Sequence, residues 1–257
     1  LVYGTGTGCT NTPKLTTTSL GMMHVEDGYL KDAYGRQWLL RGINARLEGL
    51  FDVSFNDGRT RLEPIPTFSA NDATEMAAMG FNFLRLPINW SGLEPEEGNF
   101  SDIYLEQIDD IIDWCRDAGI YVLVDFHQDA YSKEIGEDGA PAWAIVTPYT
   151  PLEGPLHDLN SRRISGDTFN AFEAFFLNQE AIQDRFMPAW KTITSRYINR
   201  PEVIGFELMN EPVVFHGLSF GSFHGIRAIP ALPPGSKVVL ENTNRSLYDY
   251  WKHWKHT

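Results

Sequence analysis

Ile204-Gly-Phe-Glu-Leu-Met-Asn210-Glu211-Pro212 is the most informative stretch of this 257-residue chain. The apolar run predicts a buried strand, and Pro212 ends it because proline lacks an N–H and has a fixed φ. The strand therefore delivers a carboxylate, Glu211, beside an amide, Asn210, at its carboxyl end. In a parallel α/β protein that end is where chemistry is done. A strand followed by a capped turn would look the same, so the rest of the chain must distinguish the two interpretations.

Three further apolar runs precede this strand and alternate with amphipathic helices. The four predicted strands cover residues 38–44, 81–87, 120–126 and 203–209. Ser69 and Ser101 are predicted N-caps of the first two helices, which end before Gly80 and Gly119. A third helical region covers 169–198, where Pro188 is expected to kink or divide it. This alternation predicts a parallel sheet covered by helices.

The regions outside these elements also carry information. Residues 1–24 are predicted to be a flexible Gly/Thr-rich tether and residues 25–257 the folded domain. A short hairpin is expected over 29–36, with Gly35 in its turn. Long loops over 45–66 and 127–166 are expected to be functional, because long loops in compact domains usually are.

Polar residues follow the apolar part of each of the last three strands. Arg85 comes first, then His127 and Asp129, then Asn210 with Glu211. A closed (β/α)₈ barrel would gather all of them around one pocket mouth, because its parallel strands end on the same face. We therefore predict a barrel of the TIM type with its site at that face.

The composition of the chain argues against some classes of binding partner. The chain has 42% hydrophobic and 13% aromatic residues and a net charge of -13, which argues against nucleic acid and against a bare anionic membrane surface. No run approaches the roughly 18 apolar residues of a membrane span. Two cysteines do not make a disulfide framework, and Cys115 is expected to be a buried hydrophobe on a helix. Cys9 could bear the lipid of an exported lipoprotein, so we expect a secreted or envelope-attached protein.

Five segments resemble glycoside hydrolase family 5, and most closely its endoglycoceramidase branch. The resemblance runs from about Gly35 to Phe215. The segments are Leu40-Arg-Gly-Ile-Asn44, Gly80-Phe-Asn-Phe-Leu-Arg-Leu-Pro-Ile-Asn-Trp90, Asp125-Phe-His-Gln-Asp-Ala-Tyr-Ser132, Gly139-Ala-Pro-Ala-Trp143 and Phe206-Glu-Leu-Met-Asn-Glu-Pro212. The third segment favours the glycolipid-cleaving branch over cellulases or mannanases.

The resemblance implies a retaining β-glycosidase acting on a carbohydrate or glycosphingolipid. Glu211 would be the general acid/base, and Asn210 would hold the sugar 2-hydroxyl. His127 and Asp129 would bind sugar hydroxyls near the cleaved bond. Arg85 would support the nucleophile as its electrostatic partner. The indole rings that could stack on sugar faces or guide an alkyl chain are those of Trp90 and Trp143.

Three of these residues also have a purely structural interpretation. Arg85 could form an interior ion pair, His127 could be a satisfied core histidine, and Trp90 could be core packing. The acidic cluster over 94–97 is expected to be a solvated loop. No organic cofactor is implied and no ligand spacing predicts a metal, since His253 and His256 lie in a basic tail without carboxylate partners.

The chain departs from the family after Pro212, where only 45 residues remain. A βα unit takes roughly 30 residues, so the tail holds one or two units at most and reads as atypical from about residue 216. The expected fold is therefore an incomplete barrel of about four to five units, poorly stable alone unless a partner copy or a rearranged tail completes it. Glu241 is the single candidate nucleophile that we can name in the tail.

Three functions remain open from the sequence. The first is hydrolysis of the bond between an oligosaccharide and ceramide, or of a related β-glycoside. The second is a non-catalytic protein that binds glycans or glycolipids and has lost the nucleophile. The third is an endo-glycanase of the same family that acts on a polysaccharide.

Overall fold

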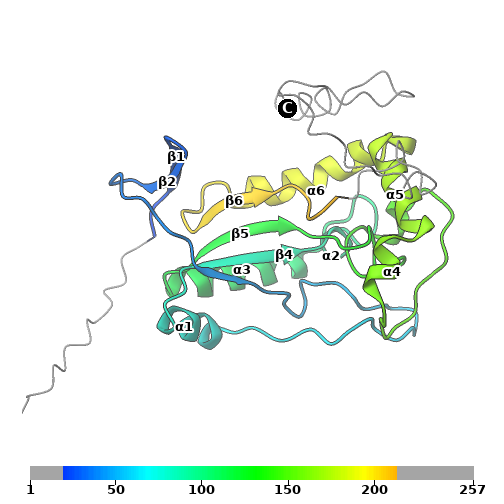
Figure 1. The fold of residues 1–257 in the computed structure, drawn as a ribbon, viewed down its shortest axis with the longest axis horizontal. Helices are drawn as coiled ribbons and strands as arrows, with labels where there is room; N and C mark the ends of the chain where they lie inside the picture. Colours follow the sequence, from blue (N-terminus) through cyan, green and yellow to red (C-terminus); the bar gives the residue numbers. More distant parts are fainter. Residues whose placement is uncertain (1–19, 213–257) are drawn as a thin grey trace, which may run out of the picture.

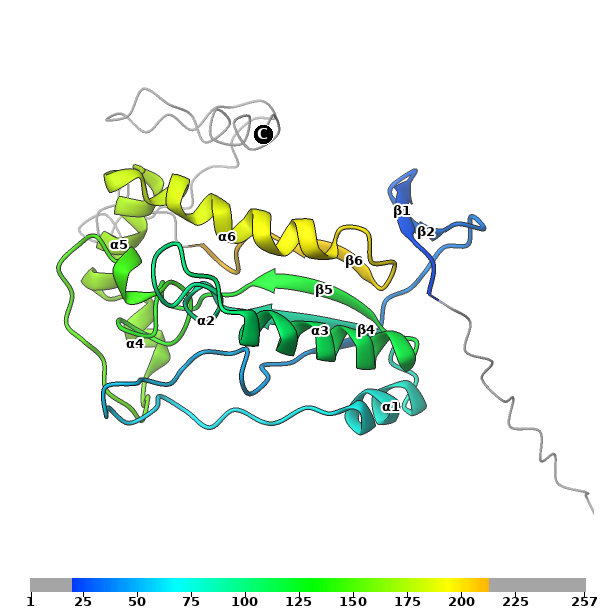
Figure 2. The same ribbon diagram turned by 180° about the vertical axis from the view of Figure 1, so that it is seen from behind.

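A four-stranded parallel sheet forms the centre of the protein. The computed structural model describes residues 20–212, and the strands lie in the order β3-β4-β5-β6. Their bounds are β3 Gly42–Asn44, β4 Phe83–Ile88, β5 Tyr121–Phe126 and β6 Val203–Glu207. Because sequential strands are neighbours and all run parallel, this is the arrangement of the first half of a (β/α)₈ barrel. Figures 1 and 2 show the long helices along one face of the sheet, with the other face free of helices.

The first two helices begin and end where their caps predicted. α1 (Ala70–Ala78) starts with a capping box in which Ser69 and Asp72 bond each other's backbone N–H, and Gly80 follows it with a φ of 85°. α3 (Asp102–Asp117) starts at Ser101, whose side chain accepts from the backbone N–H of Tyr104. Both predictions are confirmed because these signals depend only on residues within one turn.

The third helical region is divided, but not at Pro188. α5 (Gly166–Phe176) and α6 (Ile182–Tyr197) are separated by a short 3₁₀ turn, η2 (Gln179–Ala181), and Pro188 lies inside α6. Asn178 and Gln183 stabilise the break: the Asn178 Oδ1 accepts from the Gln183 N–H, and the Gln183 Nε2 donates to the Phe175 carbonyl at 2.6 Å. The prediction of a division at Pro188 was therefore wrong, because these caps and the packing of α6 on the sheet decide its position.

A hairpin that was not predicted precedes the expected one, whose turn at Gly35 is confirmed by the antiparallel bridge between Lys31 and Gln37. β1 (Met23–Glu26) pairs antiparallel with β2 (Tyr29–Asp32), and the turn between them holds Asp27 and Gly28. Gly35 lies in a second turn, where the Gly35 N–H donates to the Asp32 carbonyl. The predicted tether over 1–24 thus overlaps the first strand. Cys9, Glu241, His253 and His256 lie outside the described residues.

Two long loops cover the carboxyl ends of the strands and hold each other. They cover residues 45–66 and 127–166. The second loop contains η1 (Ala142–Ala144) and α4 (Leu159–Arg163), whereas α2 (Trp90–Leu93) follows β4 outside both loops. A small second core joins the loops, formed by Phe51, Val53, Leu62 and Leu152. Backbone bonds connect the same segments, from the Leu156 N–H to the Leu62 carbonyl and from the Gly154 N–H to the Thr60 carbonyl. The loops are therefore built structures at the edge where the predicted site residues gather.

No helix among residues 20–212 combines the length and apolar character that crossing a bilayer requires.

Candidate functional site

Arg85 is the centre of an ion-pair network and lies within β4, not at its carboxyl end as predicted. Its guanidinium donates to Glu207 at 2.8 and 2.7 Å and lies 2.9 Å from Asp125. The same group donates to the Oδ1 of Asn210 at 3.0 Å and of Asn44 at 3.2 Å. Hydrogen bonding to Glu207 raises the pKa of Arg85. The interior ion pair left open by the sequence is therefore present, and it also orients Asn210.

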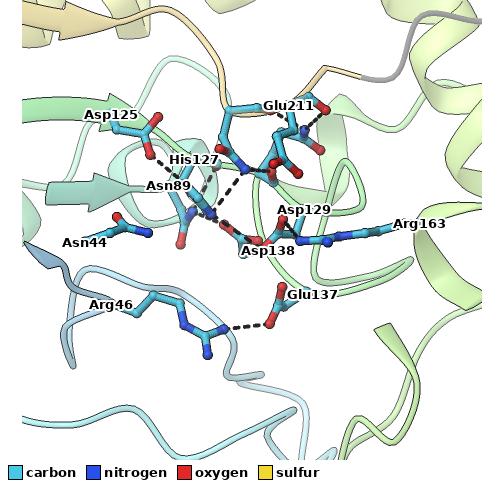
Figure 3. A network of polar contacts seen from close by, with 12 residues as sticks. Asn44, Arg46, Asn89, Asp125, His127, Asp129, Glu137, Asp138, Arg163 and Glu211 are labelled. Carbon is cyan, nitrogen blue, oxygen red and sulfur yellow. Dashed lines mark hydrogen bonds and ion pairs between the residues drawn. The ribbon is translucent and has the colours of Figure 1, made fainter. Parts of the chain in front are cut away.

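His127 follows β5 and bonds two carboxylates. Its Nδ1 lies 2.6 Å from Asp125 and its Nε2 lies 3.5 Å from Asp129, as Figure 3 shows for the surrounding network. Burial alone would lower the pKa of His127, but the hydrogen bonds to both carboxylates outweigh it and raise the pKa to about 10. The ring is consequently an imidazolium with two donated protons at neutral pH.

Asp129 is buried and held by a cation from the loop beyond it. Arg163 pairs with its Oδ1, and Asp129 is 8% exposed. Burial opposes ionisation, but hydrogen bonds from His127 and Glu137 and the Arg163 charge lower the pKa of Asp129. Asp129 therefore stays ionised beside the imidazolium. An ionised carboxylate can accept hydrogen bonds from a hydroxyl.

Three residues of this network were not singled out from the sequence. Asn89 donates from Nδ2 to Asp138 at 2.6 Å and to the His127 carbonyl at 3.0 Å. Asp138 is fully buried, and burial raises its pKa to about 7. Glu137 accepts from Arg46 at 2.7 Å. The sequence feature that could have indicated these residues is the Glu137-Asp138 pair in the loop after a core strand. The positions of these residues in the sequence do not reveal that the loop folds back onto His127 and Asp129.

His127, Asp129 and Asp138 lie close enough to be considered as cation ligands, with one atom of each within 4.8 Å of the others. The ring of His127 donates from both nitrogens, so it offers no lone pair to a metal while it is protonated. The Oδ1 of Asp129 already meets a guanidinium. His127 and Asp129 contact each other directly at 3.5 Å, whereas Asp138 is held by Asn89.

Asn210 and Glu211 follow β6 as predicted. The Asn210 N–H donates to the Phe126 carbonyl at 3.0 Å, and its Nδ2 donates to the Gln128 carbonyl at 3.0 Å. Gln128 returns bonds from Nε2 to the carbonyls of Asn210 and Glu211, at 2.5 and 3.1 Å. Glu211 has a φ of 35°, a backbone conformation that L-residues rarely adopt. The loop after β5 thus fixes the backbone of the Asn-Glu pair.

The side chain of Glu211 differs from expectation in its exposure. A general acid that keeps its proton near neutral pH needs burial or a nearby negative charge, whereas Glu211 is exposed among the described residues. Its carboxylate still acts electrostatically on Arg85, and Figure 3 shows it on the same side of the site as His127 and Asp129. Glu211 therefore lies near its predicted partners, but its side chain is not buried.

Trp90 and Trp143 form an aromatic cluster at the side of the site. Trp90 is 4% exposed, contacts Trp143 edge-on at 5.0 Å and donates from Nε1 to Glu94 at 2.7 Å. The sequence left core packing and a sugar contact open for Trp90, and its burial favours core packing. Trp143 is half-buried, with Arg185 over its ring at 4.9 Å, so its sugar contact stays a prediction.

Glu94 also corrects an expectation. It is 2% exposed and accepts from both Trp90 Nε1 and the Gly98 N–H, so it is not part of a solvated acidic loop.

Comparison with known proteins agrees with this geometry. The family described as Cellulase (glycosyl hydrolase family 5) matches residues 52–216. Endoglycoceramidase I of Rhodococcus hoagii (strain 103S) is 29% identical over 199 residues, covering 76% of this chain and 38% of that protein. The crystal structure of an endogalactoceramidase is 34% identical with a TM-score of 0.66, covering 75% of this chain and 44% of that one. Endo-glycoceramidase II from Rhodococcus sp., solved as a lactosyl-enzyme intermediate, is 32% identical with a TM-score of 0.60, covering 72% and 43%.

The matches bear on fold and family in different ways. The chain spans about two fifths of the length of the relatives it matches. The family match covers well over half of the chain and includes Arg85, His127, Asp129, Asn210 and Glu211. The chain belongs to glycosyl hydrolase family 5, with endoglycoceramidases among its relatives and a partial TIM barrel as its fold.

Proposed function

We propose that this chain carries the proton-donating half of a retaining β-glycosidase that cleaves the bond between a sugar and ceramide. Glu211 is the general acid/base, Asn210 binds the 2-hydroxyl of the sugar, and His127 and Asp129 bind neighbouring hydroxyls. In the first step Glu211 gives its proton to the glycosidic oxygen as the bond to the lipid breaks. In the second step it takes a proton from the water that releases the sugar.

The observation that carries this proposal is the fixed placement of Asn210 and Glu211 beside Arg85 and His127. The side chains of Arg85 on β4, His127 after β5 and Asn210 after β6 meet there, and Gln128 holds the backbone of the pair through two hydrogen bonds. Asn210 is oriented by Arg85 on its oxygen, so its Nδ2 faces the His127 side where a hydroxyl would bind. Such preorganised donors favour the transition state because they need no reorganisation during reaction.

The exposure of Glu211 sets a condition on the mechanism. A general acid must keep its proton near neutral pH, which requires desolvation or a nearby negative charge. We propose that the bound sugar supplies this cover. The nucleophile lies outside the described residues, where Glu241 remains the candidate from the sequence.

The relatives support the substrate class. Endoglycoceramidases and a glucosylceramidase of Rhizopus delemar occur among the matches, and one related structure holds ganglioside GM3. The lactosyl-enzyme intermediate of another supports a covalent, retaining pathway. A polysaccharide substrate is the alternative, since cellodextrinase A of Ruminococcus flavefaciens is also related.

Replacement of Glu211 by Gln tests the assignment. We expect turnover of a lipid glycoside, whose leaving group is poor, to fall about 10²–10⁴-fold, which is the usual contribution of a general acid. An aryl glycoside with a good leaving group should still react in the first step. Glu96→Gln, in the exposed loop, is the matched control. Equal loss for both substrates would refute the acid/base role.

A 2-fluoro glycoside separates an enzyme from a non-catalytic binder. A retaining enzyme should form a covalent adduct on a glutamate, detectable by mass spectrometry. Absence of an adduct, together with retained binding of a glycolipid head group, would favour the binder. Removal of the lipid from the substrate should abolish turnover for the glycolipid enzyme, whereas a polysaccharide enzyme would be indifferent to it.

A further inference from the structure

Glu137 lies at the junction of the two long loops, beneath the predicted sugar-binding residues. It is 2% exposed, and its Oε1 accepts from Arg46 Nη1 at 2.7 Å. The same Arg46 nitrogen donates to Glu63 at 2.5 Å, so one cation is shared between two carboxylates. Figure 3 shows Glu137 on the Arg46 side of Asp129.

The second carboxyl oxygen of Glu137 has no donor. Oε2 is buried and has no hydrogen-bond partner among the described residues. A buried charge without a partner is expensive, and Glu63 already takes part of the Arg46 charge. The other charged groups that face Glu137 are Asp129 and Asp138, which are both acidic. The surroundings therefore disfavour an ionised Glu137 from every side except that of Arg46.

We propose that Glu137 carries a proton on Oε2 and donates it to the carboxylate of Asp129, which makes Glu137 a positioning residue for Asp129. A protonated carboxyl turns the orphaned acceptor into a donor, and Asp129 is the ionised acceptor beside it. Burial, followed by the hydrogen bond to Asp129, raises the pKa of Glu137 to about 9. The geometry and the titration thus agree on a neutral Glu137 at pH 7.

The consequence is a fixed orientation for Asp129. It is held by the Glu137 proton, the Arg163 guanidinium and the His127 ring. This deepens the proposed function and rests on it where sugar binding is concerned, because a carboxylate clamped by three donors presents its remaining lone pair in one direction. Loop 45–66 is tied to the same point through Arg46.

Unfolding equilibria of the wild type and of Glu137→Gln test the proton without relying on activity. Glutamine has the shape of the neutral carboxyl and keeps an N–H for Asp129 and an oxygen for Arg46. The unfolded chain loses the Glu137 proton near pH 4.3, whereas the folded chain keeps it to about pH 9. The unfolding constant of the wild type, divided by that of the variant, should therefore rise about tenfold per pH unit from pH 5 to 8. A ratio independent of pH would overturn the proposal.

Infrared spectroscopy tests the proton on Glu137 by a second route. Asp138 can also contribute a protonated-carboxyl band at pH 7. The difference between the infrared spectra of the wild type and Glu137→Gln should therefore contain such a band, and a flat difference spectrum would refute the proton. Glu63→Gln, at the other carboxylate of Arg46, is the control and should retain the band.

The activity arm tests the positioning role. Glu137→Gln should keep kcat/KM on a glycolipid within a few-fold of wild type at pH 7, whereas Glu137→Ala should lose about 10–100-fold, the value of a hydrogen bond to a charged group. Equal loss in both variants would contradict the neutral-donor role. If the wild type hydrolyses no glycolipid, the proposed function fails, and the unfolding and infrared results still decide the proton.

Discussion

Replacement of Arg85 by Met should destabilise the protein far more than loss of a surface ion pair. Arg85 is the cation between Glu207 and Asp125, and the Asp125 side chain is fully buried. Removing one partner of a buried pair costs about 3–5 kcal/mol, because the other charge stays buried without compensation. Glu207 is 34% exposed and His127 still contacts Asp125, so the lower end, about 3 kcal/mol, is expected. The loss applies to the free energy of unfolding near pH 7.

Urea denaturation followed by circular dichroism measures this loss. Arg196→Met is the matched control, because Arg196 pairs with Asp109 at the surface, where ion pairs contribute about 0–1 kcal/mol. The double variant Arg85→Met/Glu207→Gln should recover part of the loss, since it removes an unpaired charge. A destabilisation by Arg85→Met no larger than that by Arg196→Met would refute the central role of the network.

Three further outcomes follow from burial, backbone geometry and titration. Trp90→Ala should lower the free energy of unfolding by about 3–5 kcal/mol in a denaturant titration, as expected for a core aromatic, and a neutral result would return Trp90 to the surface. Gly139→Ala should destabilise the protein by more than about 1 kcal/mol, because the φ of Gly139 is 126° and a Cβ would meet the Tyr131 carbonyl oxygen at 2.4 Å. Gly98→Ala should cost less, because Gly98 also has a positive φ but a Cβ there would meet open space. Thermal unfolding that ranks the two variants in the opposite order would contradict this. His127 has a folded pKa of about 10, above its unfolded value of about 6.5, so its stabilisation is complete below pH 6.5 and is lost as pH rises towards 10. The stability difference between wild type and His127→Gln should shrink over that range, and a constant difference would contradict the raised pKa.

Local signals in the sequence predicted the elements and the strand-end residues. The capping box of Ser69 and Asp72 lies within one helical turn. The prediction that Pro212 ends the last strand was wrong, because β6 already ends at Glu207. The parallel order of strands then required Arg85, His127 and Asn210 to meet at one edge, and they do. These features were predictable because each depends on neighbours in the chain or on a rule of topology.

Contacts between distant residues decided the rest. Trp90 and Glu94 belong to the core because α6 and the loop after β5 pack over them, which no period in the sequence reveals. The break between α5 and α6 depends on the two bonds of Gln183, so Pro188 stays within the helix.

The protonation of the site is also a property of the fold. By itself the sequence determined which acidic, basic and amide groups reach the strand ends. Only the tertiary structure decided that His127 is charged and Glu137 neutral, because desolvation and hydrogen-bond partners come from loops that meet only once the chain has folded.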